Sequence, residues 1–144
     1  MRLTTLSDYA LRLLMMADAA GDSLITIEAA ASRYHISRAH LMKVANVLTR
    51  AGYLQAVRGR SGGLRLAKPA RQIRIGDVIR ATEPDFAMVE CFSGDNQCII
   101  TSACKLPRIL SAASDAFINV LNESTLADIS LGPRLAALLA EHPA

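Results

Sequence analysis

The segment that most constrains the fold lies near the middle of the chain, where two short strand-like stretches flank a tip of glycine, serine and arginine. Residues 53–57 and 64–66 alternate apolar and polar side chains, and the sequence RGRSGG stands between them at 58–63. Glycine tolerates the backbone angles of tight turns, so this pattern predicts a β-hairpin. The same glycines allow the backbone at the tip to approach another molecule closely.

The segments before the hairpin have the spacing of helices. Apolar residues recur at helical intervals in three stretches, at 7–20, 27–34 and 38–50. We expect Ser7, Thr26 and Ser37 to be their N-caps, with Asp8 at the positive end of the first helix. Two short helices joined by a tight turn match a helix-turn-helix, and a hairpin directly after it would be a wing. The expected fold class is mainly α with a small β-hairpin wing.

Basic residues gather in the same part of the chain. The net charge is only +3, but residues 33–80 hold eleven Lys and Arg against one acid, Asp77. Such an excess of positive charge indicates a surface that binds a polyanion, although a basic face that is only exposed to solvent has the same composition. Three arginines around the hairpin tip favour double-stranded DNA. The predicted DNA-contacting residues are Ser37, Arg38, His40 and Lys43 in the second helix of the pair, and Arg58, Arg60, Ser61, Gly62 and Arg65 in the wing.

The C-terminal part contains one long amphipathic helix, expected from Pro107 to residue 121, with shorter pieces at 75–82, 126–129 and 135–139. Its apolar side consists of Ile109, Leu110, Ala113, Phe117, Val120 and Leu121. Because little chain is left to cover this side, we expect a dimer interface; packing against its own domain is the alternative. The expected organisation is a DNA-binding domain at 1–83, a cysteine-containing loop at 84–105, and a dimerisation helix with a tail at 106–144.

All three cysteines of the chain fall within fourteen residues, at Cys91, Cys98 and Cys104. Their polar, glycine-containing surroundings argue against three buried cysteines packed as small hydrophobes, and their odd number argues against a disulfide framework. A structural zinc site needs four ligands and usually contains a C-x₂-C pair, whereas six and five residues separate these cysteines. The wide spacing suits an iron–sulfur cluster, in which each thiolate binds a different iron, and zinc remains open.

Other classes of protein find little support in the sequence. No glycine loop has nucleotide-binding spacing, no paired carboxylates stand out, and no histidine has an obvious nucleophile partner, so an enzyme is not expected. The apolar run at the N-terminus is interrupted by Asp8, Arg12 and Asp18, and it has no cleavage site for secretion. No stretch approaches the ~18 apolar residues of a membrane span. We expect a cytoplasmic protein without a membrane partner.

With these motifs in place, the chain resembles the family of iron–sulfur winged-helix transcriptional repressors that includes NsrR, IscR and RirA. The matching stretches are MRLTTLSDYALRLLM, SRAHLMKVANVLTRAGYLQAVRGRSGGLRLAKPA, IRIGDVIRATEP, the loop of three cysteines, and the following helix that ends in STLADI. They cover nearly the whole chain, and the VRGRSGG wing followed by three cysteines and a long helix is specific to that family. The resemblance implies a homodimer with a cluster near the dimer interface.

One position separates the branches of this family. Members of the IscR type have a histidine ligand three residues after the last cysteine, where this chain has Pro107; its histidines are His35, His40 and His142. The sequence is more similar to NsrR, which implies a [4Fe–4S] cluster, with [2Fe–2S] as the alternative, held by the three cysteines and, in some members, by an aspartate from the first helix of the partner subunit. Asp8 matches that aspartate, unless it only stabilises the helix N-terminus. Arg12 can pair with Asp8 or balance the cluster charge.

The implied signal is nitric oxide, which binds iron strongly and needs no pocket. Because Asp8 stands on the first helix, its loss as a ligand would change the placement of the two recognition helices, which must lie ~34–36 Å apart to read two half-sites. Two alternatives remain. The AMVECF segment is closer to RirA, which would make iron or redox status the signal, and a zinc-binding or apo-acting regulator is the other possibility.

Overall fold

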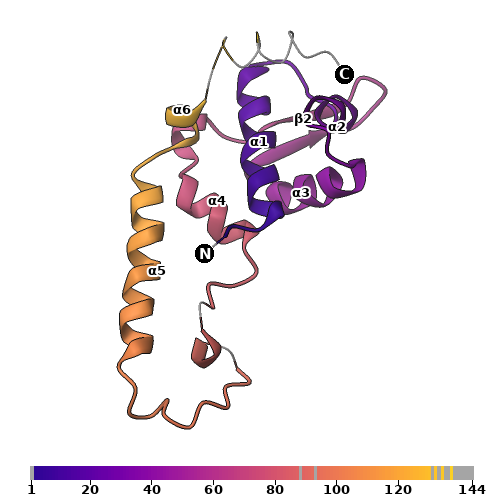
Figure 1. Cartoon of the computed structure of the whole chain (residues 1–144). Coiled ribbons are helices and arrows are strands. Elements are labelled where there is room, and N and C mark those ends of the chain that lie inside the picture. The colour runs from indigo at the N-terminus through magenta and orange to yellow at the C-terminus, as the bar shows by residue number, and fades with distance from the viewer. Residues whose placement is uncertain are drawn as a thin grey trace.

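The computed structural model describes residues 2–87, 89–92 and 94–130, together with positions 132, 134 and 137. Its elements are, in chain order, α1 (Thr5–Ala19), α2 (Ile27–Tyr34), α3 (Arg38–Arg50), β1 (Leu54–Val57), β2 (Gly63–Leu66), the 3₁₀ turn η1 (Ala70–Gln72), α4 (Ile75–Thr82), the 3₁₀ turn η2 (Glu90–Phe92), α5 (Leu106–Asn122) and α6 (Leu126–Ile129). In Figure 1, α1 to α4 and the hairpin form one body, and α5 projects from this body. The loop that precedes α5 in the chain lies at the far end of this helix. The predicted mainly helical fold with a small hairpin is confirmed; the piece expected at 135–139 falls largely outside the described residues.

Helix α1 begins earlier than the sequence predicted. Its N-cap is Thr4, whose hydroxyl accepts a hydrogen bond from the Ser7 backbone N–H at 3.4 Å. Ser7 lies within the first turn, and its buried hydroxyl bonds to Thr82 Oγ1 at 2.7 Å. The prediction of Ser7 as the cap was wrong because both residues have hydroxyls suited to capping. Burial of Ser7 against α4 decides between them, and that contact is invisible in the local sequence.

The helix-turn-helix is formed by α2 and α3, with the caps that the sequence predicted. Thr26 Oγ1 accepts from the Ala29 N–H at 3.1 Å, and Ser37 Oγ accepts from the His40 N–H at 3.3 Å. Between the helices, His35 adopts a left-handed conformation with φ 52°, which histidine tolerates better than most non-glycine residues. This residue ends α2 and reverses the chain, so that α2 and α3 pack against each other.

The hairpin is tied into the body by backbone contacts. Strands β1 and β2 pair antiparallel over their whole length, and Leu64 of β2 also exchanges two backbone hydrogen bonds with Ile25, at 2.8 and 3.0 Å. A side chain at Gly62 would overlap the Val57 carbonyl oxygen, and one at Gly63 would lie 2.6 Å from the Ile25 carbonyl oxygen. The two glycines therefore permit close packing of backbone on backbone, in addition to the turn that the sequence indicated.

Two hydrophobic clusters connect the elements. The larger one joins α1, α2, α3, the hairpin, α4 and α6, and its fully buried leucines are Leu13, Leu14, Leu41, Leu48, Leu54 and Leu126. The smaller one joins α4 to α5 through Ile75, Ile79 and Ile118. At this helix crossing Gly76 has no room for a side chain, which would overlap the Asn122 amide. Because α4 also packs on α1 and α3, it connects α5 with the helix-turn-helix.

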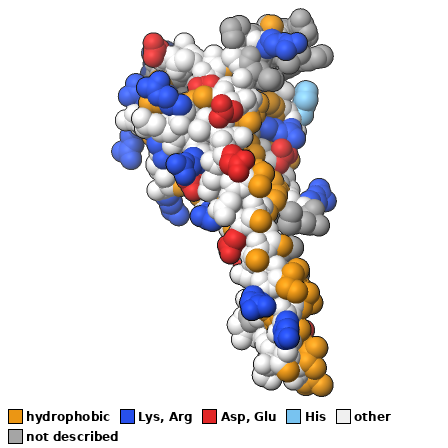
Figure 2. Space-filling model, turned by 90° about the vertical axis from the view of Figure 1, so that its left-hand side faces the viewer, with side chains coloured by type: hydrophobic (Ala, Val, Ile, Leu, Met, Phe, Trp, Pro, Cys, Tyr) orange, Lys and Arg blue, Asp and Glu red, His pale blue; other side chains and the backbone are white. Residues whose placement is uncertain are grey.

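Helix α5 buries little of its apolar surface against its own chain. Within it only Ile118 is buried, whereas Leu106, Ile109 and Val120 are 50, 61 and 62 % exposed. Figure 2 shows hydrophobic side chains in a continuous stripe along the projecting end of the molecule. An exposed apolar stripe of this kind marks an interaction surface.

Candidate DNA interface and cysteine loop

The residues predicted to read DNA from α3 are exposed at the N-terminal end of this helix: Ser37, Arg38, His40 and Lys43. Leu41 and Val44 of the same helix are buried, which fixes the orientation of the exposed side. The Arg38 guanidinium pairs with Glu28 Oε1 at 2.7 Å, and the two side chains are 65 and 61 % exposed. An ion pair this exposed contributes little to stability. Arg38 can therefore leave Glu28 and bind a DNA phosphate instead.

The wing presents a second basic surface. Arg58, Arg60 and Ser61 are exposed at its tip, and Gly62 is half-buried beside them. Arg65 is exposed on β2, where its Nε donates to Gln55 Oε1 at 3.1 Å. The helix end and the hairpin together concentrate positive charge on one body, which attracts the phosphate backbone of DNA. The individual contacts with DNA stay a prediction.

The three cysteines lie along the segment that connects α4 to α5. Cys91 is in η2 and half-buried, Cys98 is exposed, and Cys104 is half-buried just before α5. None of them forms a disulfide. Across the described part of the chain, no three Cys, His, Asp or Glu side chains lie close enough together to hold a metal ion. The structure therefore does not gather the three cysteines and Asp8 within one chain.

Asp8 lies in the first turn of α1 and pairs with Arg12 one turn later. Arg12 Nε and Nη2 donate to the two carboxylate oxygens at 2.9 and 2.8 Å, and both side chains are about half exposed. The Tyr34 hydroxyl donates to the Arg12 carbonyl oxygen at 3.1 Å. Burial raises the pKa of Tyr34, which keeps this donor protonated. The pairing of Arg12 with Asp8 is thus present, whereas iron binding by Asp8 stays a prediction.

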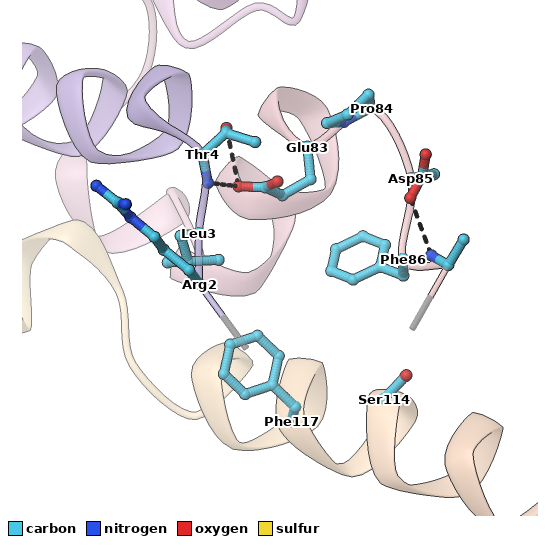
Figure 3. A pocket seen from close by; sticks show the side chains of 10 residues that line it. Arg2, Leu3, Thr4, Glu83, Pro84, Asp85, Phe86, Ser114 and Phe117 are labelled. Atoms are coloured by element: carbon cyan, nitrogen blue, oxygen red, sulfur yellow. Dashed lines mark hydrogen bonds between the residues drawn. The ribbon is translucent and has the colours of Figure 1, made fainter. Parts of the chain in front are cut away.

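A partly buried hydrogen-bond network that the sequence did not reveal links the start of α1 to the end of α4. Glu83 Oε1 accepts from the Thr4 N–H at 2.8 Å, from the Thr4 hydroxyl at 3.0 Å, and from the Ser7 hydroxyl. Figure 3 shows Glu83 directed at Thr4, next to a cavity of about 380 Å³ that Phe86 and Phe117 border. The only hint in the sequence is a polar pair, Thr82-Glu83, at the end of an apolar helix. The network anchors the first end of the cysteine loop to α1.

An exposed basic helix in a helix-turn-helix, followed by a basic hairpin, defines a winged-helix DNA-binding regulator. Residues 3–131 match the model of the Rrf2 family, described as iron-dependent transcriptional regulators. The chain belongs to this family. It is 46 % identical over 131 residues to the HTH-type transcriptional regulator NsrR of Bacillus licheniformis, an alignment that covers 90 % of this chain and 92 % of the relative.

Solved structures agree with this assignment. The oxidised form of CymR from Staphylococcus aureus has a TM-score of 0.70 at 26 % identity and covers 91 % of this chain and 97 % of its own. IscR of T. potens has a TM-score of 0.67 at 25 % identity, with coverages of 90 and 85 %. The family resemblance and the fold class are thereby confirmed, and the chain is a transcriptional regulator with DNA as its partner, not an enzyme. Among the described residues, no helix is both long and apolar enough to cross a bilayer.

Proposed function

We propose that the chain is a homodimeric repressor whose binding to operator DNA is switched by a [4Fe–4S] cluster that responds to nitric oxide. The observation that carries the proposal is a set of three free cysteines on one accessible loop, in a chain 46 % identical to a regulator named NsrR. The ligands would be Cys91, Cys98 and Cys104 of one subunit and Asp8 of the partner subunit.

The donor groups present suit such a cluster. Thiolates are the usual ligands of iron–sulfur clusters, and none of these thiols is consumed by a disulfide. Asp8 borders a hollow of about 490 Å³ that Arg12, Tyr34 and His35 also line, which offers space for a loop of the partner subunit. Among the described residues of one chain, no three possible metal ligands lie close together. The cysteine loop would therefore have to draw its three thiolates together as the cluster binds.

When bound, the cluster supplies iron atoms to which nitric oxide can attach. The thiolates of Cys91, Cys98 and Cys104 would fix the loop, and the Asp8 carboxylate would tie it to α1 of the other subunit. Both oxygens of Asp8 accept from Arg12, and a bond from one of them to iron would draw electron density from that oxygen and weaken its hydrogen bond to Arg12. A carboxylate with an alternative partner one turn away would be released more easily than the thiolates, and its release would free α1 from the loop.

The dimer would form through the apolar stripe of α5. Two recognition helices read successive major grooves only when they lie ~34–36 Å apart. Since α4 packs on both α1 and α5, a shift of α1 relative to α5 alters that separation. In this proposal residues 1–83 bind DNA, residues 84–105 bind the cluster, and residues 106–144 provide the dimerisation helix and the tail.

The decisive experiment is anaerobic purification of the full chain, followed by iron and sulfide analysis and an operator-binding assay before and after nitric oxide. We expect a brown protein whose operator affinity falls with nitric oxide. Cys91→Ala should lose the cluster and keep the fold, while Ser102→Ala, an exposed change in the same loop, should behave as wild type. A colourless protein that binds its operator at full affinity contradicts the proposal.

A second candidate is a regulator that responds to iron supply, which the description of the family as iron-dependent favours. It would use the same cysteines, but the signal would be loss of iron. A chelator and nitric oxide separate the two candidates. If removal of iron abolishes operator binding and nitric oxide leaves it unchanged, the iron-responsive function replaces the first.

A further inference from the structure

We propose that Tyr9 is a positioning residue that couples Asp8 to His40, so that the recognition helix responds to the partner that Asp8 binds. The inference rests on the proposed function, because it takes Asp8 as a ligand that alternates between Arg12 and iron. It adds a set of contacts through which a change in the partner of Asp8 would affect the DNA-contacting side of α3. Tyr9 was not among the site residues that the sequence predicted.

Tyr9 lies between two groups that belong to different parts of the molecule. On one side, the guanidinium carbon of Arg12 is 5.9 Å from the centroid of the Tyr9 ring. On the other side, the ring of His40 on α3 has its centroid 6.3 Å from that of Tyr9, with the two planes tilted by 43°. Both separations lie within the range at which cations and aromatic rings attract a neighbouring ring. Tyr9 thus contacts the partner of Asp8 and the reading helix at once.

The surroundings of Tyr9 allow its ring to change tilt while its backbone stays in place. The residue is half-buried and packs against the main core. Beyond it, a hollow of about 280 Å³ lies between the start of α1 and α3, lined by Tyr9, His40, Lys43 and Val44 among others. The ring therefore has space on the side that faces His40.

Arg12 is the group that would transmit the change. It is held to Asp8 by hydrogen bonds of 2.9 and 2.8 Å, and these would weaken if Asp8 gave an oxygen to iron, because the metal draws electron density from the carboxylate. The face of Tyr9 is another attractive group within its reach. The Arg12 main chain lies within α1, and its carbonyl oxygen accepts from the Tyr34 hydroxyl of α2, so both contacts favour a response by the side chain. Only the guanidinium moves, and its motion acts on the Tyr9 ring.

His40 is the part of the DNA-reading surface that these contacts reach. It is exposed near the N-terminus of α3, where a recognition helix contacts base edges. Arg38 of the same helix pairs instead with Glu28 of α2, so it has no such connection to Asp8. We therefore expect the state of Asp8 to change the contribution of His40 to operator binding and to leave that of Arg38 unchanged.

The test compares operator affinity of iron-loaded and iron-free protein for variants of Tyr9. Tyr9→Leu removes the ring and keeps an apolar side chain, while the control Tyr9→Phe keeps the ring. We expect Tyr9→Phe to keep the wild-type ratio of operator affinity between iron-loaded and iron-free protein. Tyr9→Leu should bring this ratio about three- to tenfold closer to one. The iron and sulfide content of both variants should equal that of wild type. In a His40→Ala background, Tyr9→Leu should have no further effect. An unchanged ratio in Tyr9→Leu, or additive effects of the two changes, overturns the inference.

A second measurement needs no iron and does not depend on Tyr9→Leu. In the iron-free wild-type chain, the ring signals of His40 are followed by NMR and assigned by their loss in His40→Ala. Asp8→Asn removes the charge that holds Arg12, and we expect it to shift these signals; without such a shift the coupling does not exist. If wild-type operator affinity proves independent of iron, the proposed function fails, while this measurement still decides whether a change at Asp8 reaches His40.

Discussion

At the start of α1, a buried serine hydroxyl depends on partners from another helix. Ser7 is fully buried and bonds to Thr82 and Glu83, which stand at the end of α4. Buried polar groups stabilise a fold when they are paired, and they destabilise it when they lose a partner. Neither partner is left unpaired when the Ser7 hydroxyl is removed, because Thr82 can donate to the Val78 carbonyl at 2.9 Å instead and Glu83 keeps two hydrogen bonds from Thr4.

Ser7→Ala should therefore lower the free energy of unfolding by only about 1–2 kcal/mol, since it removes one bonded hydroxyl without stranding its neighbours. Denaturant unfolding of the iron-free chain measures this effect. The matched control is Ser32→Ala on the exposed side of α2, which should stay within about 0.5 kcal/mol of wild type. Equal effects of the two substitutions would show that the buried network does not stabilise the contact between α1 and α4.

Gly63 offers a second test at single-residue resolution. An added Cβ would lie 2.6 Å from the Ile25 carbonyl oxygen and 2.9 Å from the Leu24 Cβ, so Gly63→Ala has to displace β2 from its neighbour. We expect a loss of about 1–3 kcal/mol in unfolding free energy and weaker binding to every DNA sequence. Gly94→Ala, where nothing lies within 4 Å of the added atom, should leave stability unchanged. A stable Gly63→Ala protein with normal DNA affinity would mean that the wing tolerates the shift.

Among the elements, the wing can be tested separately by measuring how DNA affinity depends on salt concentration. Arg60 is exposed at its tip, and an arginine there that contacts a phosphate releases bound counterions from DNA. Arg60→Ala should weaken binding to all sequences and lower the slope of log affinity against log salt by about one. Arg108→Ala, an exposed change on α5, should keep the slope. The wing would not lie at a phosphate if the slope of Arg60→Ala stayed at the wild-type value.

The elements themselves could be predicted from the sequence because their signals are local. Thr26 and Ser37 cap α2 and α3, and the glycines of 58–63 require the hairpin turn. The clustering of three cysteines was likewise visible, as was the pairing of Arg12 with Asp8, since residues four apart share a helix face. The start of α1, the Glu83 network and the contact of Tyr9 with His40 could not be predicted. Each joins residues that only the tertiary packing of α1 against α3 and α4 brings together.

For the whole molecule, the decisive feature is the arm formed by α5. Its 17 residues extend for about 25 Å, and the exposed apolar stripe along it includes Leu106, Ile109 and Val120. In Figure 1 the loop that precedes α5 lies at the far end of this arm, away from α1. A helix with this exposure is expected to be covered in solution, and the proposed cover is α5 of a second subunit.

Ile109→Asp places a charge within the stripe and should convert the dimer to a monomer, because a carboxylate there would be buried without a partner. Operator affinity should fall in parallel, since a monomer reads one half-site. Light scattering gives the molar mass, and the control Ser111→Asp changes an exposed residue outside the apolar side of α5. A dimeric Ile109→Asp protein would assign the interface to another surface.

The distance between the cysteine loop and α1 of the same chain also has a genetic consequence. If each cluster takes its cysteines from one subunit and Asp8 from the other, two different defective alleles can complement each other. A subunit with Cys91→Ala still offers Asp8, and a subunit with Asp8→Ala still offers its cysteines, so their mixed dimer contains one complete ligand set. A reporter under the operator should regain part of its regulation only when both alleles are expressed together. Failure to complement would place all ligands of a cluster in one chain.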